Sequence, residues 1–594
     1  MKSQIAIEAR TFGPQAQTRS SARFLPWLLS VGAILGLMLL IVAIHRDSPR
    51  TLISFHGYLH AAIVERFLNA GSPIPPENPF YAGKPLPYYW FFHFVAAQIS
   101  RVTGWNVFFS LETVVLAGAA LLGVACLLLG HRLFRRVATG LLMIYLVLAG
   151  TNPFGILLAG LKVLTQGTSR LKDDPGFLWN VVHPVYNLVR FNDIGALYGP
   201  LINFFLNMTS RPLALGSLML SLLCLQWTLP SPQLLPLVAL ALSVALTTAA
   251  SPIVGLAAGG VLGGLLLLFA VLPLRFLNRL TGPIRGIRRS YLTALSAIAA
   301  GLVIALPTYL HLITGASDNQ PHFYLLSIEG LKHLVTLGLS VSVLLLLAVI
   351  GYIKSSEENR GFFRLLILGS LALLVGDAAI QLPSLNQSNL FHSAVVFLAI
   401  PAAGSVITSA RRFSSEDNQV NLRATIVLVL LFLPTSAAVV SAYLSRPSLP
   451  VSFDQVLPQR QPADSSLAQL YDWIRKSTPA DAVFVLDPGH RVATNGNVLE
   501  LPAMTNRTIF TEVPGHYMAP YPDAGRRFEI ARRLTSGSAI SPADREYLAQ
   551  LRRPIYVLAT EEVHAETGRR LERQSGLPVF HAGNIVVFKT PGVR

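Results

Sequence analysis

Cysteine and charge are both scarce in this chain of 594 residues. The two cysteines, Cys126 and Cys224, fall inside apolar runs, which favours packing at lipid depth over a disulfide or a zinc site. Charged residues make up only 13% of the chain and hydrophobic residues 52%, a balance that excludes a soluble protein of this length. The composition therefore predicts a protein whose solvent includes a lipid bilayer.

Glycine-rich phosphate-binding motifs are absent from the C-terminal segment, which contains neither GxGxxG nor GxxxxGK[ST], so nucleotide binding has no support there. The net charge of +17 does not indicate nucleic acid as a partner. Its basic residues cluster beside apolar runs of about 20 residues, the length that crosses a hydrocarbon core. Such clusters are typical of cytoplasmic loops in membrane proteins.

The apolar runs predict about eleven transmembrane helices. They occupy approximately 24–44, 107–130, 137–152, 211–229, 233–249, 253–274, 291–313, 331–353, 363–381, 389–409 and 424–444. A cytoplasmic N-terminus collects most basic loop residues on one side, in the connections 131–136, 275–289, 354–360 and 411–412. The odd number of spans then places the C-terminal segment on the other side, as in a multi-pass protein of an inner (plasma) membrane.

Three parts of the chain follow from this topology. Residues 1–23 form a polar cytoplasmic tail that we expect to be disordered, and 24–444 form the membrane domain. The membrane domain includes two long external loops, 45–106 and 153–210, and loops of this length are usually functional. Residues 445–594 form an extracytoplasmic domain.

This last domain alternates helix and strand signals. A helix is predicted at 465–477, and Ser541-Pro542-Ala543-Asp544 reads as the cap and first turn of another. Short apolar strands are predicted at 482–487, 554–560 and 584–589. The pattern indicates a small α/β domain, and we expect it to fold without the helical bundle.

The first external loop begins with HGYLHAAIVERFLNAG, residues 56–71. On a helix, His56 and His60 share one stripe, whereas Glu65 and other polar residues gather on the opposite side. The pattern predicts an interfacial helix whose polar side lies in water. The histidines are either packed amphipathic side chains or a pair of ligands or proton donors.

The loop continues through a proline-rich stretch that carries Glu77 and Lys84. Pro87 permits a second short helix, and the aromatic residues at its start, Tyr89 among them, are typical of the headgroup level. Glu77 is either a solvated charge or a functional carboxylate at a cleft near the membrane. In the second loop, Asp193 can pair with Arg190 or bind a cation.

The sequence resembles the GT-C superfamily, polytopic glycosyltransferases that use polyprenyl-phosphate-linked sugars. The resemblance is concentrated in residues 55–100 and in LYDWIRKSTPADAVF, residues 470–484. It implies an α-helical polytopic fold with an external α/β domain, a lipid-linked sugar donor held among membrane lipids, and a lipid, glycan or protein acceptor. Nothing in the chain predicts an organic cofactor. Whether the protein binds a divalent cation is left open.

The chain departs from this superfamily at one position. GT-C enzymes usually carry a carboxylate a few residues before the histidine that is His60 here, where this chain has His56 and Gly57. Either Glu77 or Glu65 takes the catalytic role, or His56 does, or activity has been lost.

The predicted site lies between the two external loops. It has Glu77, Asp193 and His56 as catalytic candidates, and His60, Lys84, Arg190 and Tyr89 as substrate-binding candidates, with Arg211 as a further phosphate partner.

The alternative function is a transporter of lipid-linked sugars or a non-catalytic partner in envelope glycan assembly. A transporter should carry charged residues deep in its spans, and the runs offer little beyond Asp377. Asp377 and Gln381 are expected to form a buried polar pair that holds helices together.

Overall fold

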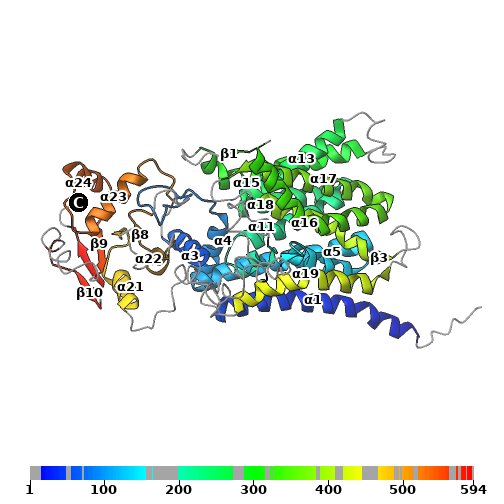
Figure 1. Ribbon diagram of the computed structural model, residues 1–594, viewed down its shortest axis with the longest axis horizontal. Helices are drawn as coiled ribbons and strands as arrows, with labels where there is room; N and C mark the ends of the chain where they lie inside the picture. The colour runs from blue at the N-terminus through cyan, green and yellow to red at the C-terminus, as the bar shows by residue number, and fades with distance from the viewer. Residues whose placement is uncertain are drawn as a thin grey trace, which may run out of the picture.

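A computed structural model describes the chain at 15–47, 55–69, 73–155, 164, 199–271, 287–314, 322–324, 327–382, 388–408, 419–444, 466–486, 494–495, 498–512, 519–560, 570, 572, 577–583 and 585–590. The protein is a polytopic helical bundle that carries a sheet-containing domain at one end. Figure 1 shows the bundle on the right, the C-terminal domain on the left, and the two short helices of the first loop between them.

Each of the eleven predicted runs is occupied by one helix. These helices are α1 (Gln15–Asp47), α5 (Val107–Phe134), α6 (Val137–Ala149), α11 (Arg211–Thr228), α12 (Leu234–Ala250), α13 (Pro252–Val271), α15 (Ile287–Thr314), α16 (Ile328–Lys354), α17 (Glu357–Ala379), α18 (Ser388–Ala403) and α19 (Leu422–Leu444). In the part of the chain that the structure describes, eight helices are long and apolar enough to cross a membrane, and α6 and α12 are shorter apolar helices. The number of spans therefore stays a prediction.

α1 begins at Gln15, so residues 15–23 of the predicted tail lie on this helix. Residues 1–14 lie outside the described chain.

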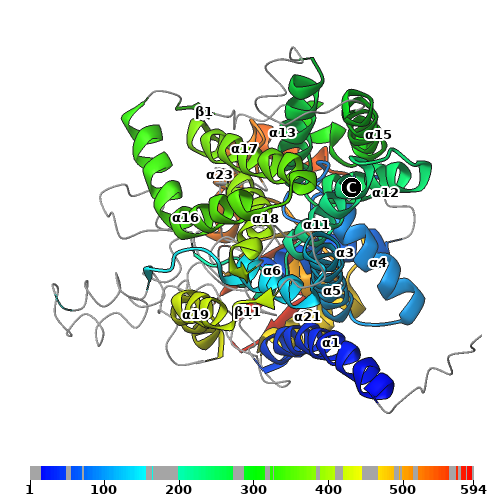
Figure 2. The same ribbon diagram turned by 90° about the vertical axis from the view of Figure 1, so that its right-hand side faces the viewer.

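Glycine contacts bring the central helices of the bundle close together. A Cβ added at Gly118 of α5 would lie 2.3 Å from the backbone nitrogen of Leu213 in α11, and one at Gly216 would lie 2.4 Å from the Gly118 carbonyl oxygen. Gly130 of α5 meets Gly140 of α6 in the same way. Small residues allow such close backbone approach in membrane bundles. α18 is buried along its whole length and forms the middle of the bundle, as the end-on view in Figure 2 shows.

The buried polar pair in the bundle is not the predicted one. The Asp377 carboxylate accepts from His333 Nε2 of α16 at 2.9 Å and from the backbone N–H of Phe391, at the start of α18, at 3.2 Å. Gln381 instead accepts from the Tyr324 hydroxyl at 2.6 Å. The expected partner was wrong because Gln381 lies beyond the end of α17, in β2, whereas His333 faces Asp377 from a neighbouring helix.

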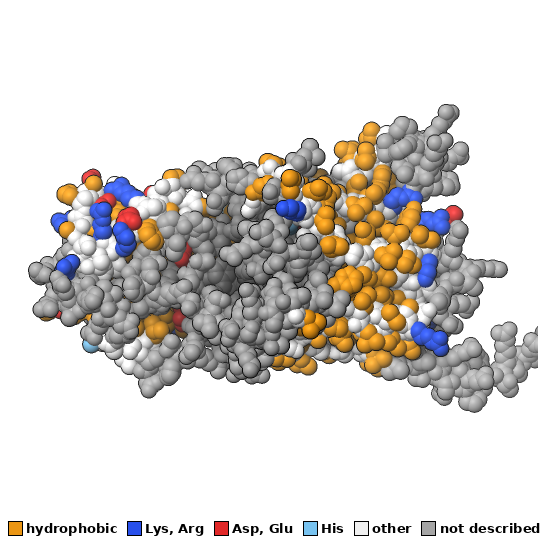
Figure 3. Space-filling view, in the orientation of Figure 1, with side chains coloured by type: hydrophobic (Ala, Val, Ile, Leu, Met, Phe, Trp, Pro, Cys, Tyr) orange, Lys and Arg blue, Asp and Glu red, His pale blue; other side chains and the backbone are white. Residues whose placement is uncertain are grey.

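The outer surface of the bundle is apolar, and its ends differ in charge. Figure 3 shows a broad hydrophobic surface with Lys and Arg side chains at the end farthest from the C-terminal domain. Exposed basic residues at the helix ends include Arg135, Arg136, Arg288, Arg289 and Lys354.

The remaining described elements of the membrane domain are short. They are α3 (Phe55–Leu68), α4 (Phe91–Thr103), α10 (Ile202–Leu206), β1 (His322–Phe323), β2 (Ile380–Gln381), a 3-10 turn (Gly404–Val406), β3 (Ile407–Thr408) and β4 (Gln419–Val420). α3 and α4 are the two helices predicted in the first external loop. α4 follows Tyr88-Tyr89-Trp90 as expected and ends at Gly104, whose φ of 70° suits a glycine.

The C-terminal domain is built on a mixed five-stranded sheet with the order β10-β11-β9-β5-β8. Its described elements are α21 (Ser466–Ser477), β5 (Val483–Val485), β6 (Thr494–Asn495), β7 (Val498–Leu499), α22 (Glu500–Thr505), β8 (Thr508–Ile509), α23 (Ala524–Thr535), α24 (Pro542–Ala549), β9 (Ile555–Thr560), β10 (Phe580–Ala582) and β11 (Ile585–Lys589). The helices at α21 and α24 and the strands β5, β9 and β11 lie where the sequence predicts them. Ser541 caps α24 by accepting from the Asp544 N–H.

The core of this domain includes the first external loop. Ala82, fully buried, packs with Val483, Phe510 and Ile530, and Tyr81 packs with Ala519 and Ala524. The domain therefore lacks part of its core when it is separated from the loop, which argues against the independent folding expected from its sequence.

Candidate functional site

The predicted site residues fall into three groups. Glu77 and Lys84 lie on the part of the first loop that contacts the C-terminal domain, with Lys84 close enough to Asp523 of that domain to stabilise its carboxylate. His60 and Tyr89 lie on the side of the bundle. The side chain of His56 and the whole of Arg190 and Asp193 are outside the described residues, so their roles stay predictions.

His60 of α3 is paired with a histidine that the sequence reading missed. Its Nδ1 lies 2.7 Å from Nε2 of His93 in α4, and the two side chains are buried. Desolvation lowers the pKa of His93 to about 3, so this imidazole is neutral at physiological pH. The neutral His93 holds the His60 ring by a hydrogen bond, and His60 is then the ring of the pair that can accept a proton. The sequence feature that could have identified His93 as a site residue is its position in the first turn of α4, the second helix of the loop.

Two stacked tyrosines lie beside this pair. Tyr88 is within 6.2 Å of His60 and 6.0 Å of His93 between ring centroids, and its hydroxyl donates to that of Tyr89 at 2.5 Å. The Tyr89 hydroxyl also accepts from Ser210 Oγ at 3.3 Å. The first loop is thereby joined to the residue that precedes α11.

Arg211 stands at the N-terminus of α11, next to Ser210. Its guanidinium lies 4.0 Å from the centroid of the Phe204 ring, which in turn packs at 4.4 Å against the buried ring of His392 in α18. The N-terminus of an 18-residue helix carries a partial positive charge, and a guanidinium beside it adds a full one. This end of α11 is therefore suited to an anionic group such as a phosphate.

These residues form one continuous cluster at the end of the bundle that faces the C-terminal domain. We call it the His–Tyr–Arg cluster: His60, His93, Tyr88, Tyr89, Ser210, Arg211, Phe204 and His392. It brings together three sequence candidates, His60, Tyr89 and Arg211, with a proton acceptor at one side and a cation at the other.

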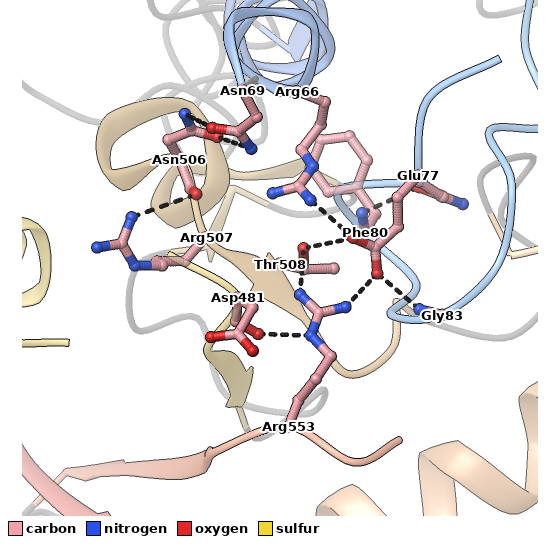
Figure 4. Close-up of polar contacts among 11 residues, drawn as sticks. Arg66, Asn69, Glu77, Phe80, Gly83, Asp481, Asn506, Arg507, Thr508 and Arg553 are labelled. Atoms are coloured by element: carbon pink, nitrogen blue, oxygen red, sulfur yellow. Dashed lines mark hydrogen bonds and ion pairs between the residues drawn. The ribbon is translucent and has the colours of Figure 1, made fainter. Parts of the chain in front are cut away.

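The Glu77 carboxylate, by contrast, is bound by other residues of the same chain (Figure 4). Its Oε2 accepts from Arg66 at 2.7 Å, and its Oε1 accepts from the Gly83 N–H at 2.7 Å and from Arg553. Thr508 Oγ1 lies 3.5 Å from Oε2. Because both carboxylate oxygens are engaged, this arrangement favours a structural role for Glu77 over that of a base.

The polar side of α3 does not face water, so that expectation was wrong. Tyr58 donates to Glu500 of α22 at 2.8 Å, and Asn69 and Asn506 exchange amide hydrogen bonds at 2.8 and 3.2 Å. Tyr58 and Arg66 are 5% and 8% exposed. The two sides of the helix were predicted correctly, but the polar side contacts the C-terminal domain instead of water.

Glu65, on this polar side, gives the contact between α3 and the domain a pH dependence. Burial raises its pKa from 4.5 to about 7, and the charge of Arg475 only partly opposes the rise. The folded state therefore binds this proton more tightly than the unfolded state, so stability falls as the pH rises from about 4.5 to about 7. The unfolding temperature of Glu65→Gln should change less between pH 5 and pH 8 than that of the wild type. An exposed control, Glu546→Gln, should keep the wild-type slope, and equal slopes in all three proteins would refute this account.

A divalent cation was left open, with Glu77 and Asp193 as the carboxylates that could bind it, and Asp193 lies outside the described residues. Within the described ranges, no group of three or more His, Cys, Asp or Glu side chains gathers as a metal site would require. The cation therefore stays a prediction.

Comparison with known proteins supports the fold. A family model described as "Uncharacterized membrane protein (DUF2298)" matches residues 13–180. A search of curated protein sequences finds no match. Among solved structures, ArnT from Cupriavidus metallidurans is similar over 96% of this chain and 98% of its own in the apo state, with 12% identity and a TM-score of 0.52.

ArnT bound to undecaprenyl phosphate gives the same TM-score and identity over 95% of this chain and 98% of its own. A mutant form of the mycobacterial arabinofuranosyltransferase AftD is similar over 94% of this chain but only 41% of its own, with 14% identity and a TM-score of 0.50. These structures are GT-C glycosyltransferases. The chain therefore has the GT-C fold predicted from its first loop and C-terminal segment.

Proposed function

We propose that this protein is a membrane glycosyltransferase that moves a sugar from a polyprenyl-phosphate donor to a lipid, glycan or protein acceptor on the non-cytoplasmic side. The observation that carries the proposal is the His–Tyr–Arg cluster, which lies at one end of a GT-C bundle. The similar fold of ArnT, solved with undecaprenyl phosphate bound, supports a lipid phosphate as the ligand class. The basic residues at the opposite end of the bundle support the orientation, because such residues favour the cytoplasm.

The chemistry is a displacement at the anomeric carbon. An acceptor oxygen forms a bond to this carbon while the bond from the carbon to the phosphate oxygen breaks, and the polyprenyl phosphate leaves with the electron pair. Arg211 and the N-terminus of α11 stabilise the charge on the departing phosphate. His60, held by its hydrogen bond to the neutral His93, takes the proton of the acceptor hydroxyl. Asp193 and His56 stay alternative bases.

Buried ionisable pairs elsewhere do not favour the transporter. His45 lies 3.4 Å from Glu112 and donates from Nε2 to the Leu206 carbonyl at 3.2 Å, and His333 pairs with Asp377. Each pair joins the ends of neighbouring helices rather than lining a described path across the bundle. These contacts hold helices together.

The test combines binding and transfer in purified protein reconstituted into liposomes. Arg211→Met should weaken binding of undecaprenyl phosphate about tenfold or more, because it removes the cation beside the helix N-terminus. Transfer from a panel of undecaprenyl-phosphate-linked, radiolabelled pentoses and hexoses should fall about a hundredfold in His60→Phe. Asp193→Asn tests the alternative base in the same assay.

The matched control is Arg423→Met, an exposed arginine at the start of α19. It should bind undecaprenyl phosphate as the wild type does. Equal weakening in Arg211→Met and Arg423→Met would refute the phosphate site. Movement of the labelled donor across the bilayer with no transfer to any acceptor would favour the transporter.

A further inference from the structure

We infer that the C-terminal domain positions α3 for the reaction, and that Glu77 is the positioning residue that joins the first external loop to this domain. The inference rests on the proposed function for its kinetic part. Its structural part, the attachment of the loop to the domain, stands on contacts of its own.

α3 is shared between the site and the domain. One side of the helix presents His60 to His93. The other side is bound by the domain through Tyr58 and Asn69, about three turns apart, while Arg66 between them pairs with Glu77 of the loop. A helix that is held along its length in this way cannot rotate or slide without breaking these contacts. The position of His60 is therefore set from the side of the domain.

The loop after α3 extends the sheet of the domain. The Ala82 N–H donates to the Ile509 carbonyl at 3.0 Å, and the Ile509 N–H donates to the Pro79 carbonyl at 3.0 Å. Ile509 belongs to β8, the edge strand of the five-stranded sheet. An edge strand leaves backbone groups unpaired, and the loop satisfies some of them here. The loop is consequently part of the domain in its hydrogen bonding as well as in its core.

Glu77 ties the two attachments together (Figure 4). Arg66 reaches it from α3, Gly83 from the loop, and Arg553 from the segment just before β9. Arg553 also donates to the Asp481 carbonyl before β5. One carboxylate thus joins α3, the loop and the segment before β9, and Arg553 continues the connection to the segment before β5. Removing its charge takes away the carboxylate that Arg66, whose side chain is 9% exposed, and Arg553 share at this junction.

The first experiment tests the attachment without any assay of activity. A protease site is inserted into the full-length chain between Leu444 and Ser466, and the purified protein is cut at that site in mild detergent. The cut domain of the wild type should stay bound to the bundle through size-exclusion chromatography. In Glu77→Gln it should dissociate at least about tenfold faster, because breaking a buried charged contact accelerates dissociation. Release of the wild-type domain on cutting would overturn the inference.

The second experiment separates positioning from simple folding. Uncut Glu77→Gln should lower kcat for transfer about tenfold or more while the KM for the lipid-linked donor changes less than about twofold, because Glu77 contacts Arg66, Gly83 and Arg553 rather than the phosphate site at Arg211. Glu77→Asp, which keeps the charge, should recover part of kcat. Unchanged kcat in Glu77→Gln, or an equal loss in Glu77→Gln and Glu77→Asp, would overturn the positioning role.

The matched control is Glu529→Gln on α23. Glu529 also pairs with an arginine, Arg532 at 2.9 Å, but on the exposed surface of the domain. This variant should behave as the wild type in the cutting and the kinetic experiments. If the wild type transfers no sugar from any donor, the proposed function fails, while the cutting experiment still decides whether Glu77 holds the domain to the loop.

Discussion

Replacing Arg527 by methionine should lower the free energy of unfolding of the C-terminal domain by about 3–5 kcal/mol, the loss typical when one partner of a buried charged contact is removed. Arg527 of α23 is 3% exposed. Its Nη1 donates to the carbonyls of Ala82 and Phe510 at 2.7 and 3.0 Å, and its Nε donates to the Tyr547 hydroxyl at 2.8 Å. The guanidinium also lies 4.1 Å from the centre of the Tyr81 ring. Methionine fills much of the volume but leaves these acceptors unpaired.

The neighbouring residue provides the control. Arg526 pairs with Asp544 at 3.1 Å, but its side chain is 46% exposed, and surface ion pairs contribute about 0–1 kcal/mol. Unfolding of both variants is followed by thermal denaturation and by hydrogen exchange of β8 and β9. Exchange should rise in Arg527→Met and also in the loop around Ala82. Equal losses in Arg526→Met and Arg527→Met would contradict the role assigned to the buried guanidinium.

Replacing Asp377 by leucine should cost the bundle about 3 kcal/mol, because it removes the partner of His333 and of the first turn of α18 at once. Asp377→Asn keeps one acceptor oxygen for the Phe391 N–H, and its amide N–H can donate to Nε2 of His333 in the other tautomer, so its loss should be smaller. Reversible unfolding in mixed micelles, read by tryptophan fluorescence, measures both changes.

Glu357→Leu is the control for this prediction, since Glu357 is exposed at the other end of the same helix. It should change stability by less than about 0.5 kcal/mol. A loss in Asp377→Asn as large as in Asp377→Leu would mean that the charge, rather than the hydrogen bonds, holds the helices together.

The sequence located the helices and the site to different extents. All eleven apolar runs correspond to helices, because a membrane helix must satisfy its backbone internally and so leaves a long apolar signal. In the C-terminal domain, Ser541-Pro542-Ala543-Asp544 located the start of α24 because capping is local. His60 and Tyr89 of the His–Tyr–Arg cluster were candidates from their positions in the first loop, and their roles stay predictions. His93 was missed because its pairing with His60 depends on how two helices cross.

The polar contacts likewise divide into features that the local sequence predicts and contacts that depend on the tertiary structure. Periodicity placed Tyr58, Arg66 and Asn69 on one side of α3, since helical geometry is a property of the local chain. It could not reveal that this side meets a domain more than 400 residues later in the chain rather than water. Glu77 and Arg553 are 476 positions apart, and no local pattern couples them. Likewise, Gln381 is four residues from Asp377, yet the partner of Asp377 is His333 on another helix.

By itself, the sequence determined that this protein is a polytopic membrane protein with a mixed α/β segment at its end, because hydrophobicity, helical period and capping act over a few residues. Tertiary structure alone decided that the first external loop is part of the C-terminal domain, that Glu77 is held by two arginines, and that His60, Tyr89 and Arg211 share one cluster. The physical reason is that ion pairs, hydrogen bonds and packing between distant segments depend on where whole helices and strands come to lie, and that position is a property of the assembled fold.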